Sequence, residues 1–261
     1  MRRRHKNVKQ LQIIFLNPFL ERKYKMPLPD KLVILTFDDG VKSQLTFAAP
    51  LLKQCGFGAT FYISEGLNFL KDKTRYLTWE EVRELHNQGF EIGNHTQHHT
   101  SVTNQTPEEL RNDIAYIDQK CEENGIPLPV TFCYPGYSNT PEAIDVLRER
   151  GFQFARCGTE PDYPYNREGG RGPAYDPQIH DPLLVPTTGA SGPNWDFDDL
   201  LWALDLAKDG QAAVLTFHGV PDLDHAWVHT DPELFERCVQ HLVDHQYTVI
   251  ALRDLANYVE V

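Results

Sequence analysis

The 261-residue chain contains few cysteines, and they are widely spaced. The five cysteines are an odd number, so at least one thiol stays unpaired, and no two of them form a C-x-x-C pair. Small secreted domains that depend on disulfides carry closely spaced, paired cysteines. The sequence therefore excludes a disulfide scaffold and agrees with a reducing compartment.

Basic residues and long apolar runs are also scarce. Lysine and arginine number 25 against 37 aspartates and glutamates, which gives a net charge of −12 with histidine neutral. So acidic a chain is poorly suited to a phosphate backbone or an anionic membrane. No segment approaches the ~18 consecutive apolar residues that a membrane-spanning helix needs. We therefore expect neither a nucleic-acid partner nor a membrane span, and the sequence carries no signal for an oligomeric state.

The first 29 residues differ from the rest of the chain. A basic start is followed by a short apolar run, which Gln12, Asn17 and Pro18 interrupt. Because no small-residue cleavage site follows, we interpret residues 1–29 as an N-terminal extension rather than a secretion signal. This favours a cytoplasmic protein, with the cell envelope or secretion as alternatives.

From residue 30 onward, apolar runs alternate with helical patterns. The runs LVILTF (32–37) and AAVLTF (212–217) are typical of strands buried on both faces. Further strands are expected at 59–63, 90–93, 130–133, 152–155, 183–186 and 247–252, with helices at 46–54, 78–87, 107–123, 141–150, 197–208, 232–245 and 253–258. This alternation predicts an α/β fold in which a parallel sheet closes into a barrel, as one domain over residues 30–261. Residues 158–182, rich in Gly, Pro, Asp and Tyr, are expected to form a long loop that lines a groove or lies on the surface.

Polar side chains follow several of these strands. Asp38 and Asp39 follow the first strand, NHTQHH (94–99) follows the third, YPGY (134–137) follows the fourth, and His218 follows AAVLTF. In a (β/α) barrel the active site lies at the C-terminal ends of the strands. We therefore expect these residues to share one site.

The histidine-rich segment suggests a metal site. His95 and His99 are four residues apart, so on a helical turn both imidazoles would point the same way, with His98 pointing elsewhere. Two imidazoles and one carboxylate leave positions open on a divalent ion, which is typical of a catalytic site. Asp39 as the ligand and Asp38 as a base would explain two acids at the rim of a buried strand. The alternative is a polar loop whose histidines face solvent.

Other candidate residues lie at or near the same strand ends. His218 is placed to act as a general acid that protonates a leaving group, and the alternative is a structural histidine at the edge of the core. Trp195 is a candidate for an apolar wall of the site. His225 and His229 lie in a loop with Trp227, and we interpret them as groove or surface residues rather than a second metal site.

Three of these segments together resemble the motifs of the polysaccharide deacetylase family, the NodB-homology domain of carbohydrate esterase family 4. TFDDG (36–40), HTQHH (95–99) and LTFH (215–218) match the motifs TFDDG, H-[ST]-x-x-H and L-x-H in order, spacing and strand context. The resemblance covers residues 30–255. It implies a distorted (β/α) barrel with about seven parallel strands and a divalent metal, most often zinc, with cobalt, nickel or manganese as alternatives.

The resemblance also implies roles for individual residues. Asp38 matches the general base and His218 the general acid, while the metal ligands match Asp39, His95 and His99. A backbone N–H near Gly136 or Tyr137 would contribute to an oxyanion hole. The sequence departs from the family at Cys133, which stands where the family has the arginine that orients the base. We hypothesise that Arg156, at the end of the next strand, replaces that arginine.

The implied activity is that of a metal-dependent hydrolase. It would remove N-acetyl or O-acetyl groups from an amino-sugar-containing poly- or oligosaccharide, and as a deacetylase it would act on linear amide bonds other than peptide bonds. Two alternatives remain at this point. One is an amidase that acts on a small or cyclic amide on the same scaffold, and the other is a catalytically silent sugar-binding domain.

Overall fold

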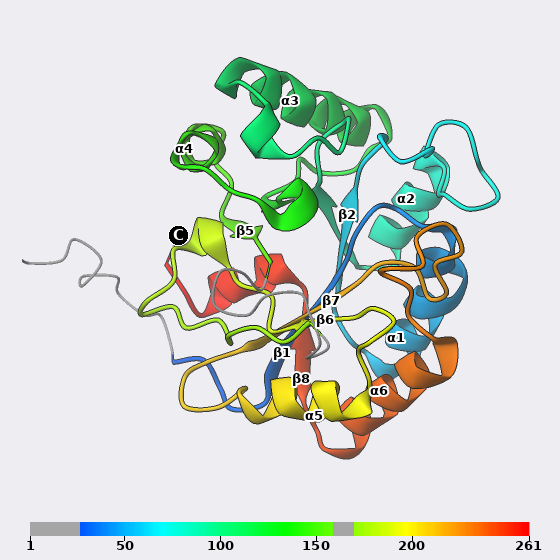
Figure 1. Cartoon of the computed structure of the whole chain (residues 1–261), viewed down its shortest axis with the longest axis vertical. Coiled ribbons are helices and arrows are strands. Elements are labelled where there is room, and N and C mark those ends of the chain that lie inside the picture. The colour runs from blue at the N-terminus through cyan, green and yellow to red at the C-terminus, as the bar shows by residue number, and fades with distance from the viewer. Residues whose placement is uncertain (1–26, 159–169, 261) are drawn as a thin grey trace, which may run out of the picture.

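The computed structural model describes residues 27–158 and 170–260, and it consists of one sheet surrounded by helices (Figure 1). Its strands are β1 (Leu32–Phe37), β2 (Thr60–Ile63), β3 (Glu91–Asn94), β4 (Thr131–Cys133), β5 (Phe154–Arg156), β6 (Gly189–Ala190), β7 (Ala213–Phe217) and β8 (Thr248–Ile250). Every pairing between these strands is parallel. Their order is β5-β4-β3-β2-β1-β7-β6, with β8 beside β1.

Strand β1 is the centre of this sheet and shows how the sheet curls. One of its edges pairs with β7 along residues 33–37. The other edge is shared, because β8 pairs with residues 32–34 and β2 with residues 36–37. Beyond the edge strand β5, the Val185 N–H donates to Ala155 and the Thr188 N–H donates to Val214, so one segment connects β5 to β7. The expected distorted barrel of parallel strands in a single α/β domain is confirmed.

Six α-helices of the described chain cover the sheet from outside (Figure 1). They are α1 (Ala49–Cys55), α2 (Trp79–Asn87), α3 (Pro107–Glu123), α4 (Pro141–Glu149), α5 (Phe197–Asp205) and α6 (Pro232–Asp244). Helix α2 begins with a capping box between Thr78 and Glu81, as its T-x-x-E spacing predicts. The bounds of α3 match the expected helix, which begins with a proline in its first turn.

Two expected elements are wrong in detail. The expected strand 183–186 is reduced to one parallel bridge between Val185 and Arg156, because Asp181 caps a 3₁₀ turn at Pro182–Leu184. The next strand is β6, which begins three residues beyond 186. The closing helix is a 3₁₀ turn at Leu252–Asn257. A short apolar run can form either a turn or a strand. Which of the two it forms depends on whether a free sheet edge lies beside it in the folded chain. Residues 1–26 of the expected N-terminal extension and 159–169 of the expected loop lie outside the described residues.

Aromatic rings fill the core beneath the C-terminal ends of the central strands. Phe37 stacks against Phe61 and Phe217, with ring centroids 4.9 and 5.6 Å apart, and Phe235 from α6 packs edge-on against Phe37 and Phe217. Each ring is at most 1% exposed. Close packing of this kind resists displacement, so the ends of β1 and β7 are held rigidly.

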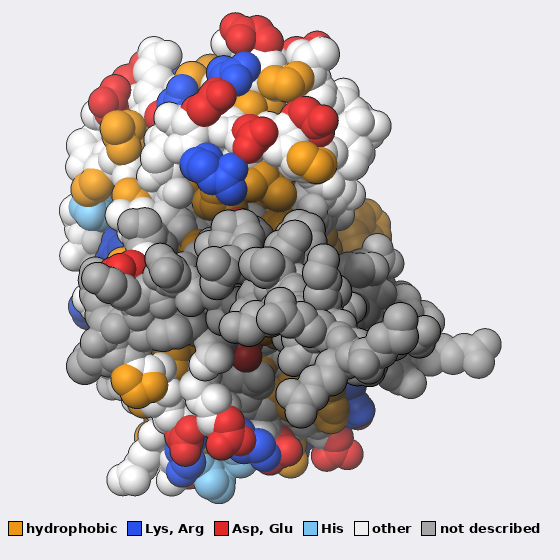
Figure 2. Space-filling model, turned by 90° about the vertical axis from the view of Figure 1, so that its left-hand side faces the viewer, with side chains coloured by type: hydrophobic (Ala, Val, Ile, Leu, Met, Phe, Trp, Pro, Cys, Tyr) orange, Lys and Arg blue, Asp and Glu red, His pale blue; other side chains and the backbone are white. Residues whose placement is uncertain are grey.

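The surface is mixed in charge. On the described part of the face shown in Figure 2, acidic and basic side chains alternate rather than forming a field of one sign. No helix among the described residues is long and apolar enough to cross a membrane.

A buried carboxylate connects the sheet to the C-terminal turn. Glu91, at the start of β3, is 1% exposed. Its carboxylate accepts hydrogen bonds from the Thr60 hydroxyl at 2.6 Å, the Thr131 hydroxyl at 2.8 Å and the Arg253 N–H at 2.9 Å. Burial raises the pKa of Glu91 above its usual value, although these three donors oppose the shift. The network therefore joins β2, β3, β4 and the segment after β8.

We expect Glu91→Ala to destabilise the protein by about 2–4 kcal/mol, because three buried donors lose their acceptor and a small cavity remains. Urea unfolding followed by circular dichroism measures the change. Glu84→Ala, which removes an exposed carboxylate from α2, is the matched control and should change stability by less than about 0.5 kcal/mol. Equal stabilities of the two variants would contradict a structural role for the network.

Candidate active site

The two consecutive acids at the end of β1 are both buried. Asp38 is 1% exposed and Asp39 is 4% exposed. The chain turns sharply here, since Asp39 and Gly40 both adopt the left-handed conformation, with φ of 73° and 63°. Aspartate tolerates that conformation better than most residues. The turn directs the two carboxylates to different neighbours.

The loop after β3 brings two imidazoles together, but not on a helical turn. Asn94 accepts a hydrogen bond from the Thr96 N–H, and the Thr96 hydroxyl accepts one from the His99 N–H. Thr96 and His99 both have positive φ, so the expected helical turn is wrong. The ring centroids of His95 and His99 nevertheless lie 4.7 Å apart, because side-chain hydrogen bonds fold the loop back on itself.

Asp39, His95 and His99 converge on one point. The Asp39 Oδ1 atom lies 3.4 Å from His95 Nε2 and 3.3 Å from His99 Nε2. The His95 Nδ1–H donates to the Cys133 carbonyl at 2.8 Å, which fixes the ring so that its Nε2 atom faces the Asp39 carboxylate. His98 points elsewhere, as expected, and its Nδ1 atom lies 2.6 Å from Oδ1 of Asp113.

This arrangement fits a divalent ion. The Asp39 Oδ1 atom is buried without a hydrogen-bond partner among the described residues, which is costly for a carboxylate oxygen. Two ligands bound at ~2.0–2.1 Å to a tetrahedral ion lie about 3.3–3.4 Å apart, which matches both separations from Oδ1. Asp39, His95 and His99 also form one of two groups of potential ligand atoms found in the described chain. The second group, Asp38, His95 and Cys133, is less suitable because Arg156 already neutralises Asp38.

Asp38 is held by a buried arginine. The Arg156 Nη2 atom donates to Oδ1 of Asp38 at 2.6 Å, and both side chains are at most 1% exposed. Its other terminal nitrogen, Nη1, donates to the Thr187 hydroxyl at 3.0 Å. The Cys133 sulfur lies 2.7 Å from Nη2, so this small side chain packs beside the guanidinium. The hypothesised arginine of β5 therefore does contact the acid at the end of β1.

His218, at the end of β7, faces both acids. Its Nε2 lies 3.7 Å from Oδ2 of Asp38 and 3.9 Å from Oδ2 of Asp39. Its Nδ1 is buried and has no hydrogen-bond partner among the described residues. Gln44 donates to the backbone carbonyls of Asp38 and His218 and so ties the ends of β1 and β7 together.

The electrostatics favour the ionised form of both acids and the neutral form of His99. Burial alone would raise the pKa of Asp38, but the Arg156 guanidinium and His218 hold it below the usual value. Burial likewise opposes ionisation of Asp39, and the surrounding imidazoles outweigh it and lower its pKa. Burial and the neighbouring His95 lower the pKa of His99 to about 4, so His99 is neutral at pH 7, as a metal ligand must be. For His95, burial lowers the pKa, but Cys133 and the carboxylates of Asp39 and Asp38 outweigh it and raise the pKa above its usual value.

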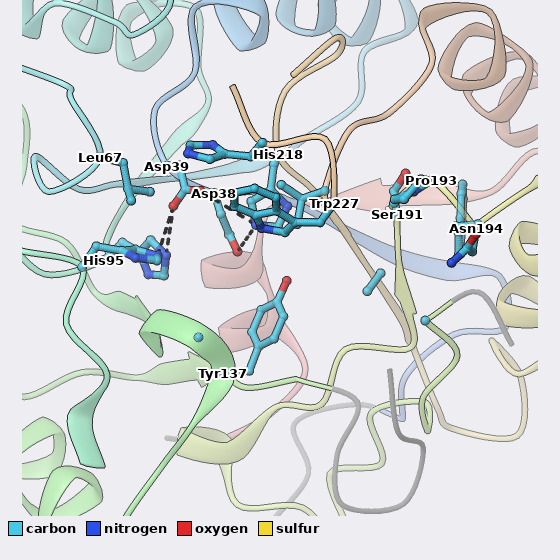
Figure 3. A pocket seen from close by; sticks show the side chains of 18 residues that line it. Asp38, Asp39, Leu67, His95, Tyr137, Ser191, Pro193, Asn194, His218 and Trp227 are labelled. Atoms are coloured by element: carbon cyan, nitrogen blue, oxygen red, sulfur yellow. Dashed lines mark ion pairs between the residues drawn. The ribbon is translucent and has the colours of Figure 1, made fainter. Parts of the chain in front are cut away.

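A pocket of about 510 Å³ opens over these groups (Figure 3). Asp38, Asp39, His95, His99 and His218 line one end of it, together with the predicted oxyanion and wall residues. These predicted residues are Gly136, Tyr137 and Trp195. The Tyr137 N–H donates to the Tyr134 carbonyl at 2.8 Å, which leaves the Gly136 N–H as the better oxyanion candidate. Trp195 is 4% exposed and packs edge-on against Phe217.

Two supporting residues were not predicted from the sequence. Gln44 holds the backbone between the two strand ends, and Thr187 anchors Arg156. Gln44 lies neither in a motif nor at the end of an expected strand. Thr187 follows the expected strand 183–186, but an uncharged threonine there is no signal of a functional residue. His225 and Trp227 also line the pocket, in agreement with their interpretation as groove residues.

Comparisons with known proteins agree with this site. The family model described as polysaccharide deacetylase matches residues 25–155. A peptidoglycan-N-acetylglucosamine deacetylase of Bacillus cereus is 32% identical over 132 residues, which cover 50% of this chain and 58% of the relative. The chain spans about half the length of the curated relatives it matches.

Solved structures share the fold. PdaA of Bacillus subtilis, a family 4 carbohydrate esterase, has a TM-score of 0.59 at 18% identity, covering 91% of this chain and 85% of its own. A family 4 acetyl xylan esterase from Clostridium thermocellum, solved with a cobalt ion, has a TM-score of 0.55 at 21% identity, covering 86% and 89%. The family model matches half of the chain and includes β1 and the histidine loop. This chain therefore belongs to the polysaccharide deacetylase family.

Proposed function

We propose that this protein is a metal-dependent deacetylase that removes N-acetyl, or O-acetyl, groups from an amino-sugar-containing poly- or oligosaccharide. The observation that carries the proposal is the buried, unpartnered Oδ1 of Asp39 between two imidazole nitrogens, beside an acid that an arginine keeps ionised. The relative from Bacillus cereus is named as a deacetylase of peptidoglycan N-acetylglucosamine, which supports the substrate class.

Asp39, His95 and His99 would hold the ion, for which zinc is the first candidate. When bound, a divalent ion of this kind lowers the pKa of water and polarises the carbonyl of the acyl group. The cobalt ion in the Clostridium thermocellum structure supports a divalent metal without selecting zinc.

Asp38 and His218 would move the protons. Asp38 is deprotonated at neutral pH, because Arg156 stabilises its charge, and so it can accept a proton from the attacking water. The Nε2 atom of His218 lies 3.7 Å from Asp38 and 3.9 Å from Asp39, and His218 would donate a proton to the departing amine. Water thus adds to the acyl carbon, the carbon–nitrogen bond breaks, and acetate and a free amino sugar leave.

The remaining pocket residues would position the acyl group. The Gly136 N–H would donate to the oxygen that gains negative charge, which is the usual role of a backbone amide in acyl transfer. Trp195 would form the apolar wall of the pocket beside it. Arg156 would act as a positioning residue, because it fixes both the charge and the orientation of the Asp38 carboxylate.

We expect the purified protein to release acetate from N-acetylglucosamine oligomers, with activity that is lost on chelation and restored by zinc or cobalt. The reason is that an ion held by Asp39, His95 and His99 would activate the attacking water and polarise the carbonyl. An acetate assay before and after treatment with a chelator measures this. Full activity in a sample shown to be free of metal would overturn the metal-dependent mechanism.

His99→Ala should lose the bound metal, because it removes one of three ligands, whereas His98→Ala should retain it. The two histidines are adjacent and differ in their partners, since His98 pairs with Asp113 rather than Asp39. Metal content measured by mass spectrometry on the purified variants distinguishes them. Retention of a full equivalent of metal by His99→Ala would contradict the ligand set.

Arg156→Ala should reduce turnover by about 10²-fold or more without loss of metal, because Asp38 loses the group that orients it. Arg150→Ala, which breaks an ion pair with Asp118 near the surface, is the control for general loss of an arginine. Circular dichroism establishes that each variant is folded, and kcat and metal content are then compared. Unchanged turnover in a folded Arg156→Ala protein would remove this role.

A further inference from the structure

The loop of residues 219–231, which follows His218, is unusually well anchored. The Ser43 hydroxyl accepts from the Val220 N–H and donates to the Pro221 carbonyl. Asp222 accepts from the backbone N–H groups of Asp224 and His225 at 3.0 and 2.8 Å. The conformation of this loop is therefore determined by side-chain contacts from several directions.

The far end of the same loop is tied to the opposite wall of the pocket. The Thr230 N–H donates to the Gly219 carbonyl at 3.3 Å, and its hydroxyl lies 2.8 Å from the hydroxyl of Ser191. Gly192 can lie close to the loop because it has no side chain. A Cβ atom at this position would be 3.0 Å from the Trp227 carbonyl oxygen. The loop and residues 191–192 thus form one continuous pocket rim.

This rigid loop presents an exposed tryptophan to the pocket. Trp227 is 70% exposed, although it lines the same cavity as Asp38 and His218 (Figure 3). A tryptophan this exposed contributes little to the core, and a well-anchored loop gives it no freedom to find a buried position. Its exposure also shows that the pocket is open to solvent on this side.

A polar side chain lies directly beside the indole. The His225 ring centroid is 5.1 Å from that of Trp227, and the ring also lies 6.4 Å from the Tyr76 ring. Its Nδ1 atom is 3.6 Å from Oδ2 of the buried Asp222, so the Nδ1 edge of the ring faces the loop. An apolar aromatic face next to a hydrogen-bonding group suits a sugar ring, which has C–H groups on its faces and hydroxyls around its edge.

We propose that Trp227 and His225 form a subsite for the sugar ring next to the one that is deacetylated, so that the enzyme binds chains more tightly than single sugars. The inference rests on the proposed function, because it places the reacting sugar over Asp38 and Asp39. Trp227 stacks on the apolar face of the neighbouring ring, and His225 reaches a hydroxyl of that ring. The open side of the pocket lets the rest of the chain continue into solvent.

The test compares Trp227→Ala, Trp227→Phe and Leu223→Ala in the zinc-loaded, full-length protein. Leu223 is the matched control, because it is 72% exposed on the same loop but lines a separate cavity with Val41 and Thr46. Acetate release is measured with N-acetylglucosamine and with its β-1,4-linked trimer. Trp227→Ala should raise KM for the trimer about tenfold and leave the monomer unchanged, while the phenylalanine variant keeps most of the trimer affinity.

A binding measurement makes the result independent of turnover. Calorimetric titration of the trimer into an Asp38→Asn background should show about tenfold weaker binding when Trp227→Ala is added, and no change with Leu223→Ala. Equal trimer affinity with and without the indole, or no trimer binding in either background, would overturn the subsite. Trimer binding that depends on Trp227, with no acetate released by the wild type, would overturn the proposed function and leave the subsite standing.

Discussion

The site depends on the burial of two adjacent carboxylates at the end of one strand. Asp38 and Asp39 are both nearly inaccessible to water, and two uncompensated charges in such a place would oppose folding. The structure compensates them separately. Asp38 is paired with the guanidinium of Arg156, and Asp39 faces two imidazoles in a geometry that suits a cation. In the proposed mechanism, this separation would leave Asp38 to accept a proton and Asp39 to bind the metal.

The barrel topology makes this separation possible. Because the strands are parallel, their C-terminal ends meet at one rim of the barrel. Side chains at the ends of β1, β3, β5 and β7 therefore lie close together. An arginine at any strand end near Asp38 could neutralise the charge of this carboxylate. In this chain it comes from β5, and the small Cys133 side chain on β4 lies against it.

In the proposed function, the residues that carry out the reaction and those that recognise the substrate would lie on different parts of the pocket. The acids and imidazoles occupy the strand ends, which the aromatic core beneath holds rigidly. The opposite rim consists of loop residues around Trp227 and Ser191, anchored by side-chain hydrogen bonds rather than by the sheet. Loops can change without disturbing the strand ends, so a rim of this kind can set the preferred substrate while the reaction stays the same.

Local sequence patterns predict the alternation of strands and helices, the bounds of α3, the capping box of α2 and the acids and histidines at the strand ends. These follow from local patterns, such as apolar runs, N-cap spacing and the residues after each strand. Three features follow from the folded chain and not from local patterns: the place of β6 at Gly189–Ala190, the positive φ of Thr96 in the histidine loop, and the contacts of Gln44 and Thr187 with the site. The folded chain also brings Arg156 to Asp38, which the sequence could suggest only as a hypothesis. Each of these depends on which distant segments lie side by side, and local patterns carry no information about such long-range contacts.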